Sequence, residues 1–344
     1  MKKLTYIILP VLLAVSMVAC EGESTGSFYD HPHHNTGTDT PDIPDTPDPE
    51  KPQYDETVYN LDQSLWKTVP VSDGVVWKNF EAADVITGAP QIVNVLDVDM
   101  DAKKNDVKLV YYYPAVTPST AFKDQKAVGV INAGYEIGSI FVKVAGNVLG
   151  SIKNAYINNT VPQWKNDGAI FIDGDNVNIS YCCKGMKLAA QRQFFFGCSE
   201  PDILSSAPML IDNNEPVGEL FAKSDLTYEQ LITLNSEDPL RHQGIRHPRT
   251  AVAKTADNHL LLITVDGRRE DVSAGMTARE LTIFLKNWFK PQYALNLDGG
   301  GSTTMCVKGQ GDQDTHVVNY PVDNGQFDHA GERVRDTHIC IIPR

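Results

Sequence analysis

Short runs of β-branched and aromatic residues, separated by turns, recur from about residue 57 to the C-terminus. Such runs are typical of β-strands, and no internal repeat relates them. Few segments between them have the periodicity of a helix. The chain therefore predicts an α+β domain in residues 57–344, with a mixed, mostly antiparallel sheet and a few packed helices. The clearest strand candidates are residues 92–98, 107–113, 127–132, 140–144, 260–265, 293–297 and 337–342.

Two helices have recognisable starts. Thr277 is followed three positions later by Glu280, which is the pattern of a capping box. Thr227 stands in the same relation to Gln230, with Leu231 next. After Thr277, apolar residues recur at the spacing of one helix face, so this helix can pack against a sheet. These residues are Leu281, Phe284, Leu285 and Trp288.

The N-terminus has the pattern of an export signal. Lys2 and Lys3 precede an apolar run that is short for a membrane span but suits the core of a signal peptide in residues 1–19. Met17-Val18-Ala19-Cys20 then resembles a lipobox, in which the cysteine is acylated. We therefore expect an exported lipoprotein of the bacterial cell envelope, attached to the membrane through Cys20. The alternative is a conventional signal peptide that is cut nearby and leaves Cys20 as an ordinary thiol.

Residues 20–56 predict a disordered linker. Residues 21–56 carry ten Asp or Glu against one Lys, and prolines alternate with acids in residues 37–52. Proline with like charges gives an extended, solvated spacer without a core. The remaining domain is also acidic and has no polybasic stretch, which argues against a partner such as duplex nucleic acid.

Five cysteines follow Cys20, at positions 182, 183, 198, 306 and 340. In an oxidising compartment, Cys198 could form a disulfide with Cys182 or with Cys183, and the sequence leaves this pairing open. Metal ligation is the weaker interpretation, because no CxxC or CxxH spacing is present.

The sharpest local pattern is an apolar strand that runs into Asp298, then Gly299, Gly300 and Gly301, and then Ser302 and Thr303. Three successive glycines point to positive φ angles or to a close approach by another group. The amide groups of such a turn can form an anion-binding nest, with Asp298 facing the same place. The structural alternative is a tight turn that Asp298 caps.

A basic loop forms the second pattern. Residues 239–256 contain no acid, and they include Arg249 followed by Thr250. A local positive zone suits an anionic substrate, and a guanidinium can hold phosphate oxygens with two hydrogen bonds. A solvated basic loop would give the same composition.

The third pattern is a buried strand that ends in Asn132, Tyr135 and Glu136. Asn132 could donate to a substrate, Tyr135 could stack on a sugar ring, and Glu136 could act as an acid or a base. A strand followed by an ordinary turn is the plainer interpretation. No HExxH, GxSxG or P-loop motif is present, which argues against zinc proteolysis, α/β-hydrolase chemistry and nucleotide hydrolysis.

In this order, the segments resemble the phosphodiester glycosidase family, the relatives of the mannose 6-phosphate uncovering enzyme. The resemblance spans residues 129–344, a little under two-thirds of the chain. Two positions depart from the family pattern, Glu136 where an aromatic residue is common and Asn213 where a glycine is common. The matching motifs are Gly129-Val-Ile-Asn132-Ala-Gly-Tyr, Ala207-Pro-Met-Leu-Ile-Asp212, Arg249-Thr-Ala-Val-Ala, Asp266-Gly-Arg268, Gly275-Met-Thr277-Ala-Arg-Glu-Leu281, Asp298-Gly-Gly-Gly-Ser302-Thr, Asn319-Tyr-Pro and Glu332-Arg333-Val.

The resemblance implies hydrolysis of the C1–O bond of a sugar-1-phosphodiester, with release of free sugar and a phosphomonoester. On this hypothesis Arg249 and the backbone of residues 299–302 hold the phosphate, with Thr250 and Thr303 beside it. Asp298 stabilises the sugar cation or activates water. Asn132 and Asp266 orient the substrate, and Arg333 is a second cationic contact. The candidates for a second carboxylate are Glu136, Asp212 and Asp323.

Two other functions fit the same residues. A non-catalytic surface module could bind anionic glycans, and a phosphodiesterase could cleave the P–O bond instead. No cofactor is required for the glycosidase reaction, although carboxylate-rich loops could hold a divalent cation near the phosphate. The glycosidase hypothesis needs Arg249 and Asp298 to share one pocket, although some fifty positions separate them in the sequence.

Overall fold

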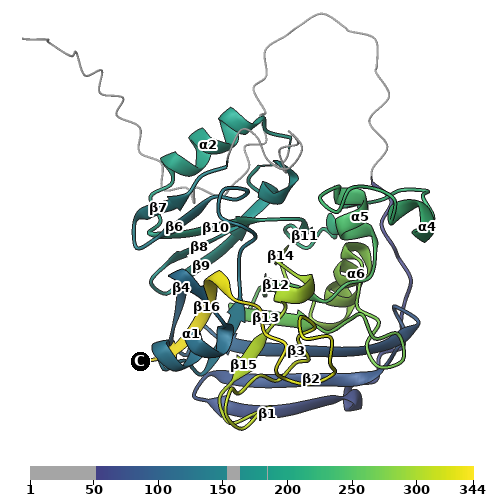
Figure 1. The fold of residues 1–344 in the computed structure, drawn as a ribbon, viewed down its shortest axis with the longest axis horizontal. Coiled ribbons are helices and arrows are strands. Elements are labelled where there is room, and N and C mark those ends of the chain that lie inside the picture. Colours follow the sequence, from purple (N-terminus) through teal and green to yellow (C-terminus); the bar gives the residue numbers. More distant parts are fainter. Residues whose placement is uncertain (1–51, 153–162, 184) are drawn as a thin grey trace, which may run out of the picture. The chain divides into compact units, whose positions relative to one another are not determined.

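The computed structural model describes residues 52–152, 163–183 and 185–344. The predicted signal peptide, Cys20 and the linker up to residue 51 lie outside the described residues. Three sheets form the fold, and every pair of neighbouring strands in them is antiparallel. The predicted α+β class with a mostly antiparallel sheet is therefore confirmed (Figure 1).

The largest sheet has seven strands. In spatial order they are β1 (Trp66–Ser72), β2 (Val75–Asp84), β3 (Ala89–Asp99), β13 (His259–Val265), β12 (Arg249–Lys254), β14 (Tyr293–Asn296) and β11 (Met209–Ile211). The five-stranded sheet consists of β7 (Asn147–Gly150), β6 (Val142–Val144), β10 (Asp202–Ser206), β8 (Gly168–Asp173) and β9 (Asn176–Ser180). The four-stranded sheet consists of β15 (Met305–Val307), β5 (Gly129–Asn132), β16 (Arg335–Pro343) and β4 (Asn105–Val116).

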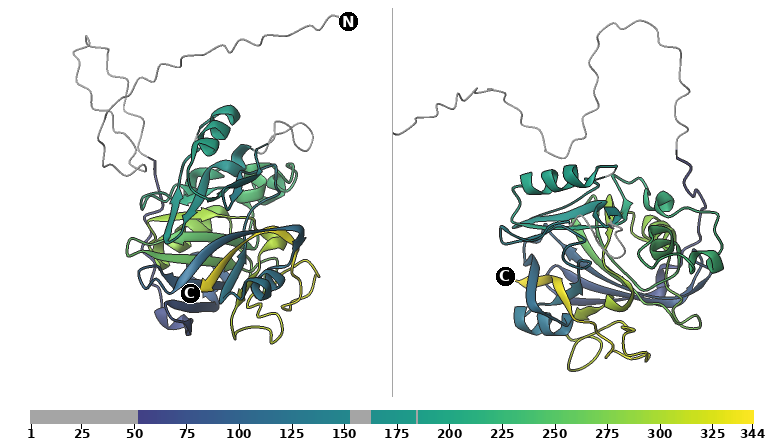
Figure 2. Two further views of the ribbon diagram at one scale, coloured as in Figure 1. Left: turned by 90° about the vertical axis from the view of Figure 1, so that its left-hand side faces the viewer. Right: turned by 45° about the horizontal axis from the view of Figure 1, so that its top comes forward.

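The helices are short, apart from two. They are α1 (Pro118–Gln125), α2 (Leu188–Gly197), α3 (Gly218–Phe221), α4 (Tyr228–Leu231), α5 (Pro239–Gly244) and α6 (Ala278–Trp288). Single 3-10 turns occur at Gln63–Leu65, Gln163–Asn166 and Gly300–Ser302. Figure 2 shows α2 lying over the five-stranded sheet, against which Phe195 of this helix packs.

All seven predicted strand segments overlap with strands, namely with β3, β4, β5, β6, β13, β14 and β16, although residues 127–128, 140–141 and 297 lie outside them. Both predicted helix starts are also confirmed, because Thr277 with Glu280 and Thr227 with Gln230 form complete capping boxes. The second helix, α4, ends at Leu231 after one turn.

The core lies on both faces of the seven-stranded sheet. Along β13, Leu260 and Leu262 point to one face, and Leu261, Ile263 and Val265 point to the other. This alternation follows from the period of two in a strand. The first face packs against the other two sheets, and α6 covers the second face (Figure 1).

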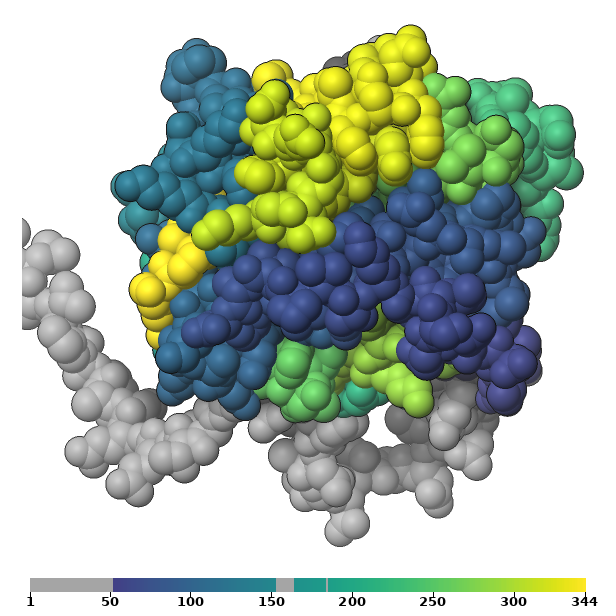
Figure 3. All heavy atoms as spheres, turned by 90° about the horizontal axis from the view of Figure 1, so that it is seen from below, coloured from purple at the N-terminus to yellow at the C-terminus, as the bar shows by residue number. Residues whose placement is uncertain are grey.

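The C-terminal part of the chain returns to the N-terminal strands. Figure 3 shows one face of the molecule, on which residues after β15 lie beside the strands β1 to β3. Among the described residues, no helix is both long enough and apolar enough to cross a membrane.

Candidate active site

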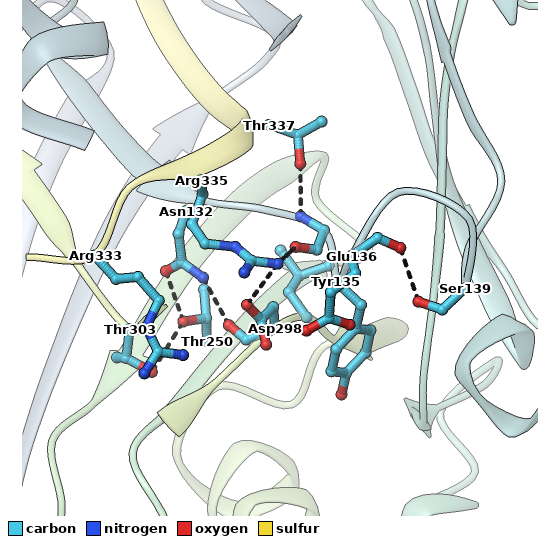
Figure 4. A network of polar contacts seen from close by, with 12 residues as sticks. Asn132, Tyr135, Glu136, Ser139, Thr250, Asp298, Thr303, Arg333, Arg335 and Thr337 are labelled. Carbon is cyan, nitrogen blue, oxygen red and sulfur yellow. Dashed lines mark hydrogen bonds and ion pairs between the residues drawn. The ribbon is translucent and has the colours of Figure 1, made fainter. Parts of the chain in front are cut away.

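Asn132, the last residue of β5, joins the four-stranded sheet to the segment that follows β14. Its side-chain amide donates to the carbonyl oxygen of Asp298 at 2.6 Å. Its side-chain oxygen accepts from the Thr250 hydroxyl at 2.9 Å and from the Thr304 amide at 3.1 Å. All of these side chains are buried, and Figure 4 shows Asn132 and Thr250 beside Asp298. Asn132 therefore positions Asp298 through protein contacts.

The three glycines after Asp298 are each required by a close contact. A Cβ atom at Gly299 would lie 2.8 Å from the carbonyl oxygen of Pro248. Gly300 has a φ of +60°, and a Cβ there would lie 3.1 Å from Nη2 of Arg268. A Cβ at Gly301 would overlap with the side chain of Arg333 and with that of its ion-pair partner. Two guanidinium groups therefore lie directly against the glycine turn.

Arg333 is held in place by Asp323. Its Nε and Nη2 atoms donate to the two carboxylate oxygens at 2.5 and 2.6 Å, and its side chain remains 42% exposed. The bond to Asp323, together with the charges of Asp298 and Glu136, raises the pKa of the Arg333 guanidinium. Arg333 therefore lies within electrostatic reach of both other carboxylates.

Arg268 has a different environment. Its side chain is exposed, and no hydrogen bond or ion pair of its guanidinium occurs among the residues that the structure describes. Partial burial and the neighbouring charge of Arg333 lower the pKa of Arg268. Two guanidinium groups that repel each other in this way are suited to bind an anion between them.

Asp298 itself is enclosed. Its Oδ2 atom lies 3.1 Å from Nη2 of Arg335, and the two side chains are 11% and 12% exposed. Burial raises the pKa of the Asp298 carboxyl, although Arg335 and Ser302 act in the opposite direction. Arg335 also donates to the carbonyl oxygen of Gly134 at 3.0 Å (Figure 4). The guanidinium is therefore held by the segment after β5 as well as by the segment after β14.

Glu136 is the exposed carboxylate of the group, with 50% of its side chain accessible. Its Oε2 atom lies 3.3 Å from Nζ of Lys165, a lysine that is 1% exposed. Burial alone would raise the pKa of Glu136, but the charges of Lys165 and Arg335 outweigh this effect and lower it. The site thus holds one carboxyl with a raised pKa and one with a lowered pKa, which is a common basis for divided acid and base roles.

Strands β12 and β14 are antiparallel, and Ala251 pairs with Asn296. Two residues further along this register, the backbone of Arg249 faces that of Asp298. Its guanidinium, however, is fully buried and donates to protein oxygens. The three shortest of its five hydrogen bonds go to the carbonyl of Met276 at 2.7 Å, the side chain of Gln243 at 2.7 Å and the carbonyl of Ile245 at 2.8 Å. Burial lowers the pKa of Arg249 to about 10. The predicted proximity to Asp298 therefore holds for the backbone, while the guanidinium has other partners.

Tyr135 lies close to both Arg249 and Asp298. Its hydroxyl donates to the carbonyl oxygen of Ala207 at 3.0 Å and accepts from Gln243 at 3.2 Å. The side chain is 2% exposed, and its ring packs against Trp164 and His242. Tyr135 is therefore part of the packed support of the site.

Asp266 is buried behind the glycine turn. One of its oxygens accepts from the Asn319 side chain at 3.0 Å and from the Tyr320 amide at 3.1 Å. Asn319 in turn donates to the carbonyl oxygen of Thr303 at 3.0 Å. Burial raises the pKa of Asp266 to about 7, against the effect of these hydrogen bonds. Asp266 thus stabilises the segment after the glycine turn through Asn319.

The remaining predicted residues divide between the site and other places. Ser302 and Thr303 are buried directly after the glycine turn. Asp212 lies in a turn with Glu215 after β11, and its charge acts on Tyr54 and Tyr181.

The predicted cysteine pairing is absent from the structure. Cys182, Cys183 and Cys198 are free thiols in one cluster, with 3.9 Å between the sulfur atoms of Cys182 and Cys183. In residues 52–152, 163–183 and 185–344, no group of three or more His, Cys, Asp or Glu is arranged to hold a metal ion.

Two residues of the site escaped the sequence analysis. Arg335 stands two positions after Arg333 at the start of a strand, and this spacing alone could have suggested a second cation on the same side. Lys165 carries no local pattern that marks it. Cavities of about 300 and 380 Å³ lie elsewhere, beside Glu219 and Arg279. We place the site at Asp298 because the charged groups converge there.

A partly enclosed carboxyl group next to several arginines is the kind of site that suits an anionic substrate. The chain belongs to the phosphodiester glycosidase family, whose model matches residues 125–342. The structure is similar to that of the zebrafish N-acetylglucosamine-1-phosphodiester alpha-N-acetylglucosaminidase catalytic domain, which is auto-inhibited by its pro-peptide. That similarity has a TM-score of 0.52 at 18% identity and covers 81% of this chain and 84% of the other.

A curated relative is known only as an uncharacterized protein. The SPbeta prophage-derived protein YomE of Bacillus subtilis is 34% identical over 93 residues, which is 24% of this chain. The match spans only 14% of the length of YomE. The identity to the zebrafish enzyme is low, so that comparison supports the fold, and the family match supports membership.

Proposed function

We propose that this protein hydrolyses the glycosidic C1–O bond of a sugar-1-phosphodiester and releases free sugar and a phosphomonoester. The observation that carries the proposal is the position of Arg268 against Gly300 and of Arg333 against Gly301. Two guanidinium groups that could bind an anion thus lie close to an enclosed carboxyl group. Membership of the phosphodiester glycosidase family supports the same reaction.

The phosphate would lie over Gly300 and Gly301, between the guanidinium groups of Arg268 and Arg333. Both groups are accessible, and Arg268 has no carboxylate partner among the described residues. In the reaction, water adds to C1 and the C1–O bond breaks, with its electron pair going to the phosphate oxygen. Because a phosphate is stable as an anion, with a second pKa of about 6, the leaving group needs little protonation. Nearby guanidinium groups can therefore supply much of the stabilisation.

Asp298 would act at the sugar carbon. Its carboxyl is fixed through Asn132 at the backbone and through Arg335 at the side chain. A carboxylate held in this way can stabilise the positive charge that develops at C1, or it can accept a proton from the attacking water. Arg249 would act as a positioning residue, since its guanidinium donates to five protein oxygens next to the strand that leads to Asp298.

The N-terminal sequence supports a place for this reaction outside the cytoplasm. In this proposal, residues 1–19 are removed and the protein is anchored through acylated Cys20. A Cys20→Ser variant should then move from the membrane fraction to the soluble exported fraction. Equal membrane association of the variant would count against the anchor.

The reaction is tested with purified protein and a UDP-sugar or another sugar-1-phosphodiester. We expect release of free sugar, and an Asp298→Asn variant should lower kcat by at least about 100-fold. In water labelled with heavy oxygen, the label should appear in the sugar. A label in the phosphate would establish P–O cleavage and overturn the proposal, and tight binding without any product would favour a binding module.

A further inference from the structure

We propose that Glu136 selects the sugar, because its carboxylate accepts hydrogen bonds from hydroxyl groups of the sugar bound beside Asp298. Lys165 acts as the positioning residue that holds this carboxylate. The inference rests on the proposed function and adds to it a subsite for the uncharged part of the substrate. It also separates the residue that recognises the sugar from the residue that acts at C1.

The exposure of the side chains points to Glu136 as an accessible carboxylate close to Asp298. Half of its side chain is accessible, whereas Asp298 and Arg335 are almost enclosed and Lys165 is fully buried. Glu136 therefore presents an accessible carboxylate close to Asp298 (Figure 4). Because half of the side chain is accessible, the carboxylate of Glu136 can accept hydrogen bonds from hydroxyl donors in addition to its bond with Lys165.

Lys165 fixes this acceptor in place. Its ammonium lies 3.3 Å from Glu136, 2.7 Å from Glu237 and 4.7 Å from the centre of the Tyr135 ring. Such a buried cation with two carboxylates has little freedom to move. A recognition group whose rotamer is fixed by its surroundings discriminates better than a mobile one.

The order of the charged groups assigns Glu136 to the sugar and not to the phosphate. In Figure 4, the carboxyl group of Asp298 lies between Arg333 on one side and Glu136 on the other. A phosphate would be repelled by the carboxylate of Glu136 and attracted by the guanidinium of Arg333. With C1 at Asp298, the phosphate extends toward Arg333, and the hydroxyl groups of the sugar ring extend toward Glu136.

The test measures whether Glu136 and one sugar hydroxyl act together. Wild-type protein and a Glu136→Met variant are assayed with UDP-sugars in which single hydroxyl groups are replaced by hydrogen. In the wild type, loss of at least one hydroxyl should lower kcat/KM by about 10- to 100-fold, as expected for a hydrogen bond to a charged group. In the variant, loss of the same hydroxyl should lower kcat/KM by less than about threefold.

Glu237→Gln is the matched control, because it also removes a carboxylate from Lys165. This variant should keep the hydroxyl preference of the wild type. The assignment is overturned if Glu136→Met loses as much as the wild type for every hydroxyl, or if Glu237→Gln abolishes the preference to the same extent.

The two proposals can fail separately. If the wild type hydrolyses no sugar-1-phosphodiester, the proposed function fails. The same comparison is then made by calorimetric binding of non-hydrolysable sugar-1-phosphonates with and without each hydroxyl. A preference that depends on Glu136 in binding would support the subsite without the reaction, and equal losses in both proteins would overturn it.

Discussion

Arg335 and Asp298 form an ion pair of 3.1 Å between two side chains that are both nearly enclosed. Arg335 is the first residue of β16 in the four-stranded sheet, and Asp298 follows β14 of the seven-stranded sheet. Contact between two sheets therefore sets the charge environment of the carboxyl at the centre of the site. The acidity of Asp298 depends on this contact, because burial raises its pKa and Arg335 opposes that effect.

Replacing Arg335 with Gln should change the pH dependence of activity. Without the cation, the strongest effect that opposes burial is lost, so the pKa of Asp298 rises further. If the ionised carboxylate is the active form, the acidic limb of the kcat/KM profile should move to higher pH. On that limb, each unit of movement costs about tenfold in rate. Arg335→Lys retains the charge and should move the limb less, and an unmoved limb in Arg335→Gln would contradict this role for the pair.

Arg249 and Arg268 should respond differently to substitution. Arg249→Met leaves several buried carbonyl groups without their donor, so we expect a loss of roughly 3 to 5 kcal/mol in the free energy of unfolding. For a domain of this size, that corresponds to a Tm about 10 °C lower. Arg268→Gln should leave Tm unchanged and raise KM by about tenfold. Thermal unfolding and steady-state kinetics on both variants test whether Arg249 acts on stability and Arg268 on substrate binding. An unchanged Tm with a raised KM in Arg249→Met would instead support direct contact of Arg249 with phosphate.

The fold was largely predictable because its signals are local. Runs such as residues 260–265 carry the composition and alternation of a strand, and Thr277 with Glu280 marks a helix start by itself. The motif around Asp298 also pointed to a residue of the candidate site, since three glycines in a row need a physical reason.

The partners of the charged residues were not predictable in the same way. The sequence shows an arginine at position 249, but it does not show which carbonyl groups will surround the guanidinium. Those carbonyls belong to Ile245 and Met276, whose positions depend on how α5 and the segment before α6 pack on β12. Lys165 was missed for a related reason, because its two carboxylates come from distant parts of the chain.

Gly301→Ala should disturb the site through a steric clash and not through backbone strain. The backbone at this residue does not need a positive φ, but a Cβ would overlap with Asp323 and with the guanidinium of Arg333. The displaced ion pair should raise KM and lower the free energy of unfolding by about 1 to 3 kcal/mol. Gly309→Ala is the control, because it has a φ of +72° and open space around it. It should cost roughly 1 to 2 kcal/mol through backbone strain and leave KM unchanged. An unaltered KM in Gly301→Ala would show that Arg333 does not contact substrate.

Asp266 should make the stability of the protein depend on pH. Its pKa is about 7 in the folded protein because of burial, and about 3.9 in the unfolded chain. The folded state therefore holds the proton more tightly. The stabilisation is complete below about pH 4 and is lost as the pH rises toward 7, by on the order of 4 kcal/mol in total.

Asn resembles the neutral carboxyl and can still accept from Asn319 and Tyr320, so Asp266→Asn should lose less stability over this range. Urea unfolding at pH 5, 6.5 and 8 compares the two proteins, and the difference between them cancels the other titrating groups. Parallel curves for wild type and variant would mean that Asp266 is already ionised in the fold.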